Sequence, residues 1–131
     1  MSQIDLLAVL VAAASSFAIG GLWYSPMLFG NAWQREAGDG RKLGEGHPAR
    51  VFGTSFAFAL LAALVYAWLM PAPADAVQAL VQGVAVGAGI VAASFGINYQ
   101  FANRSAALLL IDGGYHTVQF ALFGLILGLW R

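Results

Sequence analysis

The chain has 131 residues, of which 60% are hydrophobic and 9% are charged, and its formal net charge is +0. Water-soluble domains carry about a quarter charged residues, so this chain has too few polar groups to cover a globule of its size. The composition excludes an ordinary cytosolic enzyme, and the zero net charge removes the electrostatic basis for binding nucleic acid. Because the chain has no cysteine, disulfides and thiolate metal sites are also excluded. We expect one membrane domain over residues 1–131.

Four apolar stretches are long enough to cross a bilayer. A helix of about 20 apolar residues spans the hydrocarbon core, and runs of this kind lie at about residues 4–26, 51–70, 76–101 and 106–130. The runs are continuously apolar rather than alternating, which favours helices over a β-barrel. The sequence therefore predicts an all-α integral membrane protein whose four transmembrane helices form a bundle.

The basic residues indicate the orientation of these spans. Most of them lie in the first connection, residues 27–50, and Arg104 lies in the third. Positively charged loops stay in the cytoplasm, so we expect both connections there and both termini outside the cytoplasm. Within the first connection, Phe29 and Trp33 lie four residues apart, which is typical of a short helix in the membrane interface. The residues from 38 to 48 are rich in glycine and charge and indicate a flexible link.

The two halves of the chain have similar segments. Phe58 and Phe120 each begin a short apolar stretch, and a tryptophan follows ten residues after each, at Trp68 and Trp130. One hypothesis is a pair of tandem two-helix repeats, related by an axis along the membrane normal. The alternative is chance similarity, because matches arise easily in helices rich in alanine and leucine.

Small residues are spaced for close helix packing. In lipid, helices associate through close backbone approach and buried polar contacts. The third and fourth spans each contain glycines four residues apart, namely Gly83 with Gly87 and Gly124 with Gly128. We interpret these glycines as packing surfaces within the bundle, in preference to a dedicated dimer interface. For a bundle this small we nevertheless expect a homodimer.

Asp112 is the only charged residue well inside a predicted span. His116 and Gln119 follow it at spacings of four and seven, which places the three side chains on one helical face with Tyr115 beside them. The imidazole of His116 is the expected partner of the carboxyl group. Since the third connection is short, the end of the third span reaches the same side, and Asn98 is expected to face Asp112. The candidate polar site comprises six residues: Asp112, His116, Gln119, Tyr115, Asn98 and Tyr99.

Two functions are compatible with such a site. An intramembrane carboxyl group costs free energy unless it is paired, hydrated or protonated, and it often marks an ion or proton path. The chain is then a transporter or channel for a small solute, an ion or protons, using the face of Asp112, His116 and Gln119. The preferred interpretation is a polar clamp that fixes helix register in a non-enzymatic structural or interaction bundle.

No catalytic residue, cofactor or metal site is expected. Asp112 and His116 supply only two ligands, and no second histidine or carboxylate is expected to be buried. The expected partners are the lipid bilayer and a second copy of the chain, with no nucleic acid; the sequence does not identify a substrate.

Several segments together resemble a known family. They are Leu22-Trp-Tyr-Ser-Pro-Met-Leu-Phe-Gly30 followed by Trp33, the pair Asn98-Tyr99, Gly114-Tyr-His116, and the closing Gly124-Leu-Ile-Leu-Gly-Leu-Trp130. The chain resembles the bacterial membrane family catalogued as domain of unknown function 1761 (DUF1761). The resemblance implies a small four-helix protein of the bacterial inner membrane, and it transfers no activity and no functional residue.

The most specific of these segments has a physical interpretation as a helix exit. Pro26 disfavours a helical conformation at Ser25, and aromatic side chains anchor helix ends at the membrane interface. We interpret Trp23, Tyr24, Ser25 and Pro26, together with Trp33, as an interfacial motif that ends the first span and starts the interfacial helix.

Overall fold

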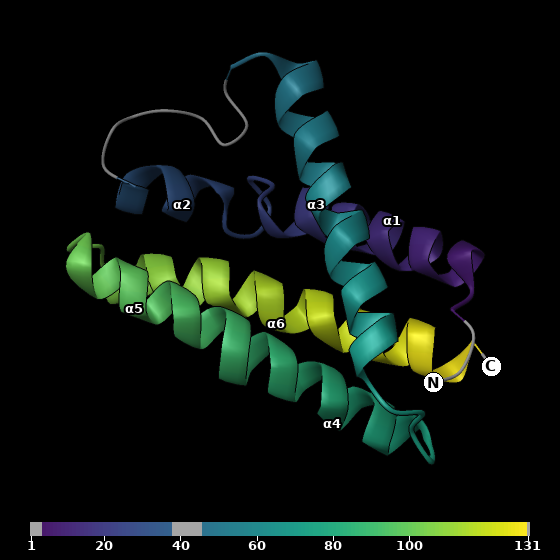
Figure 1. Cartoon of the computed structure of the whole chain (residues 1–131). Coiled ribbons are helices and arrows are strands. Elements are labelled where there is room, and N and C mark those ends of the chain that lie inside the picture. The colour runs from purple at the N-terminus through teal and green to yellow at the C-terminus, as the bar shows by residue number, and fades with distance from the viewer. Residues whose placement is uncertain (1–3, 38–45, 131) are drawn as a thin grey trace.

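The computed structural model of the chain describes residues 4–37 and 46–130, and these residues form helices joined by short connections. Figure 1 shows the whole arrangement. In chain order the elements are α1 (Leu6–Trp23), α2 (Gly30–Ala37), α3 (Pro48–Leu69), α4 (Ala76–Val86), the π-helical turn η1 (Gly87–Ala92), α5 (Ala93–Phe101) and α6 (Ala106–Leu129). Arg41 and Lys42, which contribute to the predicted orientation, lie outside the described residues, as does most of the predicted flexible link.

The prediction of four long apolar helices is confirmed. Helices long and apolar enough to cross a membrane are Leu6–Trp23, Pro48–Leu69, Ala76–Phe101 and Ala106–Leu129. The third of these is one continuous segment made of α4, η1 and α5. The predicted short helix after the first span is present as α2. The first span ends at Trp23, earlier than predicted, because a tight turn around Ser25 replaces the helical hydrogen bonds.

Side chains cap the helices where their first backbone N–H groups lack helical partners. Asp5, Asp75 and Ser105 accept hydrogen bonds from the first turns of α1, α4 and α6. Asp5 also accepts a hydrogen bond of 2.9 Å from the indole Nε1 of Trp130. This bond joins the start of α1 to the end of α6, so these two helices run in opposite directions.

Helix α6 is the centre of the fold. It packs against every other helix, and in Figure 1 it lies between α1 and the α4–α5 segment. α3 packs chiefly on α1 and only weakly on α6, and it crosses both in Figure 1. α6 also carries Asp112, Tyr115, His116 and Gln119, which are discussed below.

The glycine motifs of α4 and α6 face each other. A Cβ atom at Gly83 would lie 2.2 Å from the Phe120 carbonyl oxygen, and one at Gly124 would lie 2.3 Å from the Ala79 carbonyl oxygen. A Cβ at Gly87 would lie 2.7 Å from the Cα of Thr117. Such short distances leave no space for a side chain, so the two backbones touch. These glycines therefore line an interface within the chain.

The bundle is closely packed at one end and open at the other. The apolar core joins the first half of α1 to the second halves of α3 and α6, and consists of Ala8, Val9, Ala12, Ala63, Tyr66, Phe120, Phe123 and Leu127. Toward the other end, the first turns of α3 are mostly exposed and point away from the neighbouring helices (Figure 1). Because the start of α3 diverges from α1 and α6, a space is left between these three helices.

We predict that Gly83→Ala destabilises the protein, because the new Cβ collides with the backbone of α6 and forces the two helices apart. Overpacking of this kind costs about 1–3 kcal/mol. The matched control is Gly89→Ala in the same span, where an added Cβ meets no atom within 4 Å. Unfolding by denaturant in detergent micelles measures both variants. Equal stability of the two would contradict the close packing of α4 on α6.

Candidate functional site

The carboxyl group of Asp112 is held by two tyrosines from other spans. Its Oδ1 accepts a hydrogen bond of 2.6 Å from the Tyr24 hydroxyl, and its Oδ2 accepts one from the Tyr99 hydroxyl. Asp112 is only 8% exposed. Both oxygens therefore have protein partners, which offsets the cost of burying the group. We call Asp112, Tyr24 and Tyr99 the tyrosine–aspartate clamp; it ties the ends of α1 and α5 to α6.

The aromatic residues at the end of α1 bind to α6 as well as marking a helix exit. The indole Nε1 of Trp23 donates a 2.9 Å hydrogen bond to the carbonyl oxygen of Ile111, next to the clamp. The ring lies close over Gly114, where a Cβ atom would come within 2.9 Å of it. Gly114 thus provides room for Trp23. The interpretation of Trp23 and Tyr24 as interfacial anchors alone missed these contacts.

The remainder of the interfacial motif forms the turn into α2. The Ser25 hydroxyl donates to the Leu22 carbonyl at 2.7 Å, and the Ser25 carbonyl accepts from the backbone N–H groups of Leu28 and Gly30. Pro26 is exposed, and Trp33 lies partly buried within α2. The turn therefore fixes where α2 starts relative to the clamp.

The expected pairing of Asp112 with His116 is wrong. The Nδ1 of His116 lies 2.6 Å from the Oε1 of Gln119 on the next turn of α6. The imidazole is stacked on the Phe95 ring, with centroids 5.0 Å apart and an interplanar angle of 18°. The Tyr115 side chain points toward α1, where its hydroxyl donates to the Ser16 carbonyl at 2.9 Å. Five of the six predicted residues thus divide into the clamp, the His116–Gln119 pair and the Tyr115 contact, and Asn98 belongs to none of these groups.

Asn98 does not face Asp112 as predicted; Asn98 is exposed, and Tyr99 makes the contact. In a regular helix, about 11 residues make three turns, so Asn98 would lie on the same face as Gly87, which touches α6. The π-helical turn η1 between them contains a wider turn, which shifts the following residues by about one position. Tyr99 therefore replaces Asn98 on the face toward α6.

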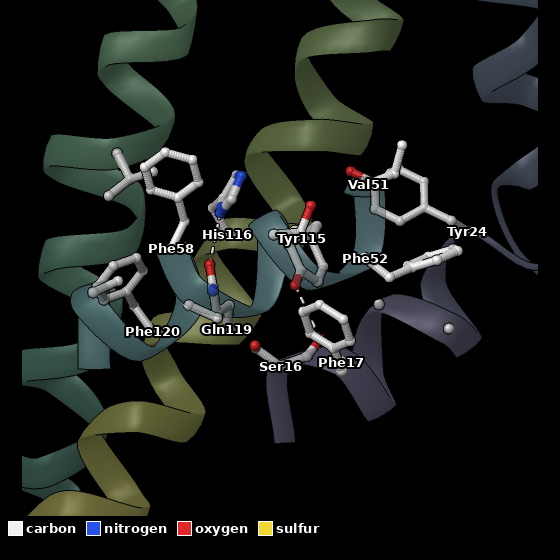
Figure 2. Close-up of a pocket in the computed structure, with 16 residues that line it drawn as sticks. Ser16, Phe17, Tyr24, Val51, Phe52, Phe58, Tyr115, His116, Gln119 and Phe120 are labelled. Atoms are coloured by element: carbon white, nitrogen blue, oxygen red, sulfur yellow. Dashed lines mark hydrogen bonds between the residues drawn. The ribbon is translucent and has the colours of Figure 1, made fainter. Parts of the chain in front are cut away.

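A cavity of about 780 Å³ lies between α1, α3 and α6. Figure 2 shows its wall, to which α6 contributes Tyr115, His116 and Gln119 and α3 contributes Phe52 and Phe58. Its lining residues are Ser16, Phe17, Gly20, Gly21, Tyr24, Val51, Phe52, Ser55, Phe58, Ala59, Ala62, Val91, Tyr115, His116, Gln119 and Phe120. None of these lining residues is Asp, Glu, Lys or Arg. Asp112 lies outside the wall, so the cavity carries no formal charge unless His116 is protonated.

The cavity has a polar pair inside a largely apolar wall. His116 and Gln119 come from α6, and rings from three helices surround them, including Phe17, Phe58 and Phe120. On α3 the wall is open, since Phe52 and Phe58 are 52% and 66% exposed. Such a space suits a lipophilic molecule with a few polar atoms. Within the described residues, no three histidine, cysteine or acidic side chains come together as a metal site would require.

We predict that Tyr24→Phe and Tyr99→Phe each lower the free energy of unfolding by about 1–3 kcal/mol, since each leaves one oxygen of a buried carboxyl group unpaired. The control is Tyr66→Phe, because the Tyr66 hydroxyl is buried without a hydrogen-bond partner in the described structure and its removal costs nothing. Unfolding in detergent micelles provides the comparison. The loss at Tyr24 should shrink when Asp112→Asn is also present; strictly additive losses would contradict the clamp.

A family model described as "Protein of unknown function (DUF1761)" matches residues 7–128. No curated protein and no solved structure matches the chain. The matched region includes the clamp, the cavity and all four long helices except Leu6 and Leu129 at their outer ends. The resemblance noted in the sequence is thereby confirmed, and the chain belongs to the DUF1761 family of proteins of unknown function.

Proposed function

We propose that this chain is a non-enzymatic binding protein of the membrane, which takes a lipophilic small molecule from the bilayer into the cavity between α1, α3 and α6. The observation that carries this proposal is the large, mostly apolar cavity whose lining residues include no Asp, Glu, Lys or Arg. Its volume of about 780 Å³ falls in the range of small-molecule sites, about 300–1,000 Å³.

The side on which the cavity opens supports entry from lipid. Many of the large side chains exposed on α3 are apolar, and two of them, Phe52 and Phe58, belong to the cavity wall. In a bilayer these side chains contact lipid tails. A lipophilic molecule therefore passes from the tails into the cavity without crossing a polar barrier.

The tyrosine–aspartate clamp has a structural role in this proposal. It uses both oxygens of Asp112 and holds α1 and α5 against α6. Because α3 packs mainly on α1, the clamp also sets how far α3 lies from α6. The clamp thus supports one wall of the cavity without contributing Asp112 to its lining.

The proposed orientation in the inner membrane of a bacterium places α2 on the cytoplasmic side and both termini outside. The Nη1 of Arg104 donates a 2.7 Å hydrogen bond to the Ala37 carbonyl at the end of α2. The first and third connections thus share one end of the bundle, as the positive-inside rule requires of two basic loops. The homodimer and the pair of tandem two-helix repeats, which the sequence suggests, remain predictions.

Ion or proton transport by the face of Asp112, His116 and Gln119 is the alternative. Such a path needs ionisable groups that pass a charge from one to the next, whereas Asp112 is nearly buried with both of its oxygens bonded, and His116 pairs with Gln119 instead of Asp112. We therefore predict no proton or potassium flux through the purified protein in liposomes, for the wild type and for Asp112→Asn alike. Flux in the wild type that disappears in the variant would establish the alternative.

Photolabelling tests the binding proposal directly. We predict that para-dodecylbenzophenone in liposomes labels the cavity residues, Phe58 and Phe120 among them, more strongly than residues exposed elsewhere on α3, such as Leu69. The introduced ring of Ser55→Phe fills part of the cavity and is expected to reduce this labelling at least about threefold. The yield at each residue is measured by peptide mass spectrometry.

The control for this experiment is Thr54→Phe. Thr54 and Ser55 are adjacent, exposed hydroxyl residues of α3, but only Ser55 lines the cavity. Thr54→Phe adds the same ring to the lipid-facing side and should leave the labelling unchanged. Uniform labelling along α3, unaffected by either substitution, would show that the probe senses lipid exposure alone and would refute the proposal.

A further inference from the structure

The hydroxyl groups on the cavity wall have already donated their hydrogens, with one exception in the described structure. Tyr24 donates to Asp112, Tyr115 to the Ser16 carbonyl, and Ser16 to the Ala13 carbonyl. The hydroxyl of Ser55, on the open side, has no such bond within the described residues. The hydrogen-bond donors left to meet a ligand deep in the cavity are therefore those of His116 and Gln119.

The His116–Gln119 pair presents the same kinds of group to the cavity in either of its two arrangements. If the imidazole Nδ1–H donates to the Gln119 carbonyl oxygen, the histidine Nε2 is left as an acceptor and the glutamine NH₂ as a donor. If the amide is turned and its NH₂ donates to Nδ1, Nε2–H is a donor and the amide oxygen is an acceptor. Each arrangement offers one free acceptor and at least one free donor.

Aromatic contacts fix the position of this pair. Phe95 stacks on one face of the His116 ring, and Tyr115 packs edge-on at a centroid distance of 4.9 Å. Gln119 is 6% exposed, so its amide has little freedom to turn toward solvent. A polar pair held in this way binds a complementary head group at a low cost in conformational entropy.

The surroundings of the pair restrict the charge of the ligand. Since none of the lining residues is Asp, Glu, Lys or Arg and a neutral His116 carries no charge, an ionic head group would lose its hydration without gaining a counter-charge, which is unfavourable. A head group with only acceptors would leave the acceptor of the pair unpaired, and one without polar atoms would leave both the donor and the acceptor of the pair unpaired. An uncharged group that both donates and accepts satisfies the pair.

We infer that the ligand has an uncharged head that both donates and accepts hydrogen bonds, and that His116 and Gln119 bind this head. This inference rests on the proposed function. Primary amides, alcohols and protonated carboxylic acids have this chemistry. The apolar body of the ligand then lies among the rings of Phe17, Phe58 and Phe120, toward the open side of the cavity.

A second copy of the chain fits this cavity less well. The surfaces that the spans expose to lipid consist largely of apolar side chains, among them Leu61, Leu64, Val81 and Leu110. Within those helices the backbone N–H and carbonyl groups already bond to one another. A helix of a second copy would therefore cover the cavity and leave the donor and acceptor of the pair unsatisfied.

A matched set of probes tests the inference on the wild-type protein in phosphatidylcholine nanodiscs. Radiolabelled dodecanamide is displaced by N,N-dimethyldodecanamide, whose head accepts but cannot donate, and by dodecane, which does neither. All are compared at equal mole fraction in the bilayer. We expect dodecanamide to bind at least about tenfold more tightly than either competitor, which corresponds to the cost of leaving the pair unsatisfied.

Variants locate this difference at the pair. Gln119→Leu should remove the preference for dodecanamide while the binding of dodecane persists. The matched control is Thr117→Val, which lies on α6 beside His116 but not among the lining residues. An independent readout comes from NMR of isotopically labelled histidine, since the chain has only two histidines: the Nε2 signal of His116, and not that of His47, should shift when dodecanamide binds.

The outcomes separate this inference from the proposed function. Equal affinity for all three probes would overturn the head-group inference, although the cavity would still be a lipophilic site. Binding of none of them would overturn the proposed function as well. If no probe binds and Ser55→Phe dissociates a dimer, a second copy fills the cavity and both ideas are wrong.

Discussion

The architecture depends on the need to satisfy one buried carboxyl group. Inside a bilayer water is not at hand to hydrate Asp112, so its partners must come from the protein. Tyr24 and Tyr99 supply them from two other spans, and each tyrosine is thereby fixed against α6. The position of Tyr24 in turn sets the turn into α2, while the neighbouring Trp23 is held by the Ile111 carbonyl. One carboxyl group and its two hydrogen bonds thus determine how α1, α5 and α6 meet.

Close backbone packing complements this contact at other points along α6. Gly83 and Gly124 let α4 touch α6 directly, and such packing replaces the hydrophobic driving force that lipid removes. If the third span were regular throughout, the face that carries these glycines would bring Asn98 toward α6. The wider turn at η1 changes the register and brings Tyr99 there. The third span can therefore pack closely on α6 near its start, at Gly83, and also form a hydrogen bond with α6 near its end, at Tyr99.

The sequence was sufficient for the elements and for the close packing at Gly83 and Gly124, but it was insufficient for the hydrogen-bonded contacts and for the cavity. The four spans and the short helix α2 follow from apolar runs and from Pro26, which are local signals. The choice of Tyr99 over Asn98 depends on a π-helical turn in Gly87–Ala92, a segment whose composition differs little from that of an ordinary helix. The spacing alone allows His116 to pair with Gln119 as well as with Asp112. Asp112 is the expected partner because opposite charges attract, and the sequence contains no signal for the other choice. The cavity depends on the direction in which α3 leaves its neighbours, which no local pattern encodes.

The two polar groups of α6 differ in what remains free after folding. At Asp112 both oxygens are used by tyrosines, so the group contributes to structure and has little capacity for a ligand. One turn further along, His116 and Gln119 satisfy each other only in part, and their remaining donor and acceptor belong to residues that line an apolar space. A polar pair that keeps a free donor and a free acceptor inside the protein costs free energy, unless a ligand forms hydrogen bonds with both. The same helix therefore separates a group that holds the bundle together from a pair that is suited to bind.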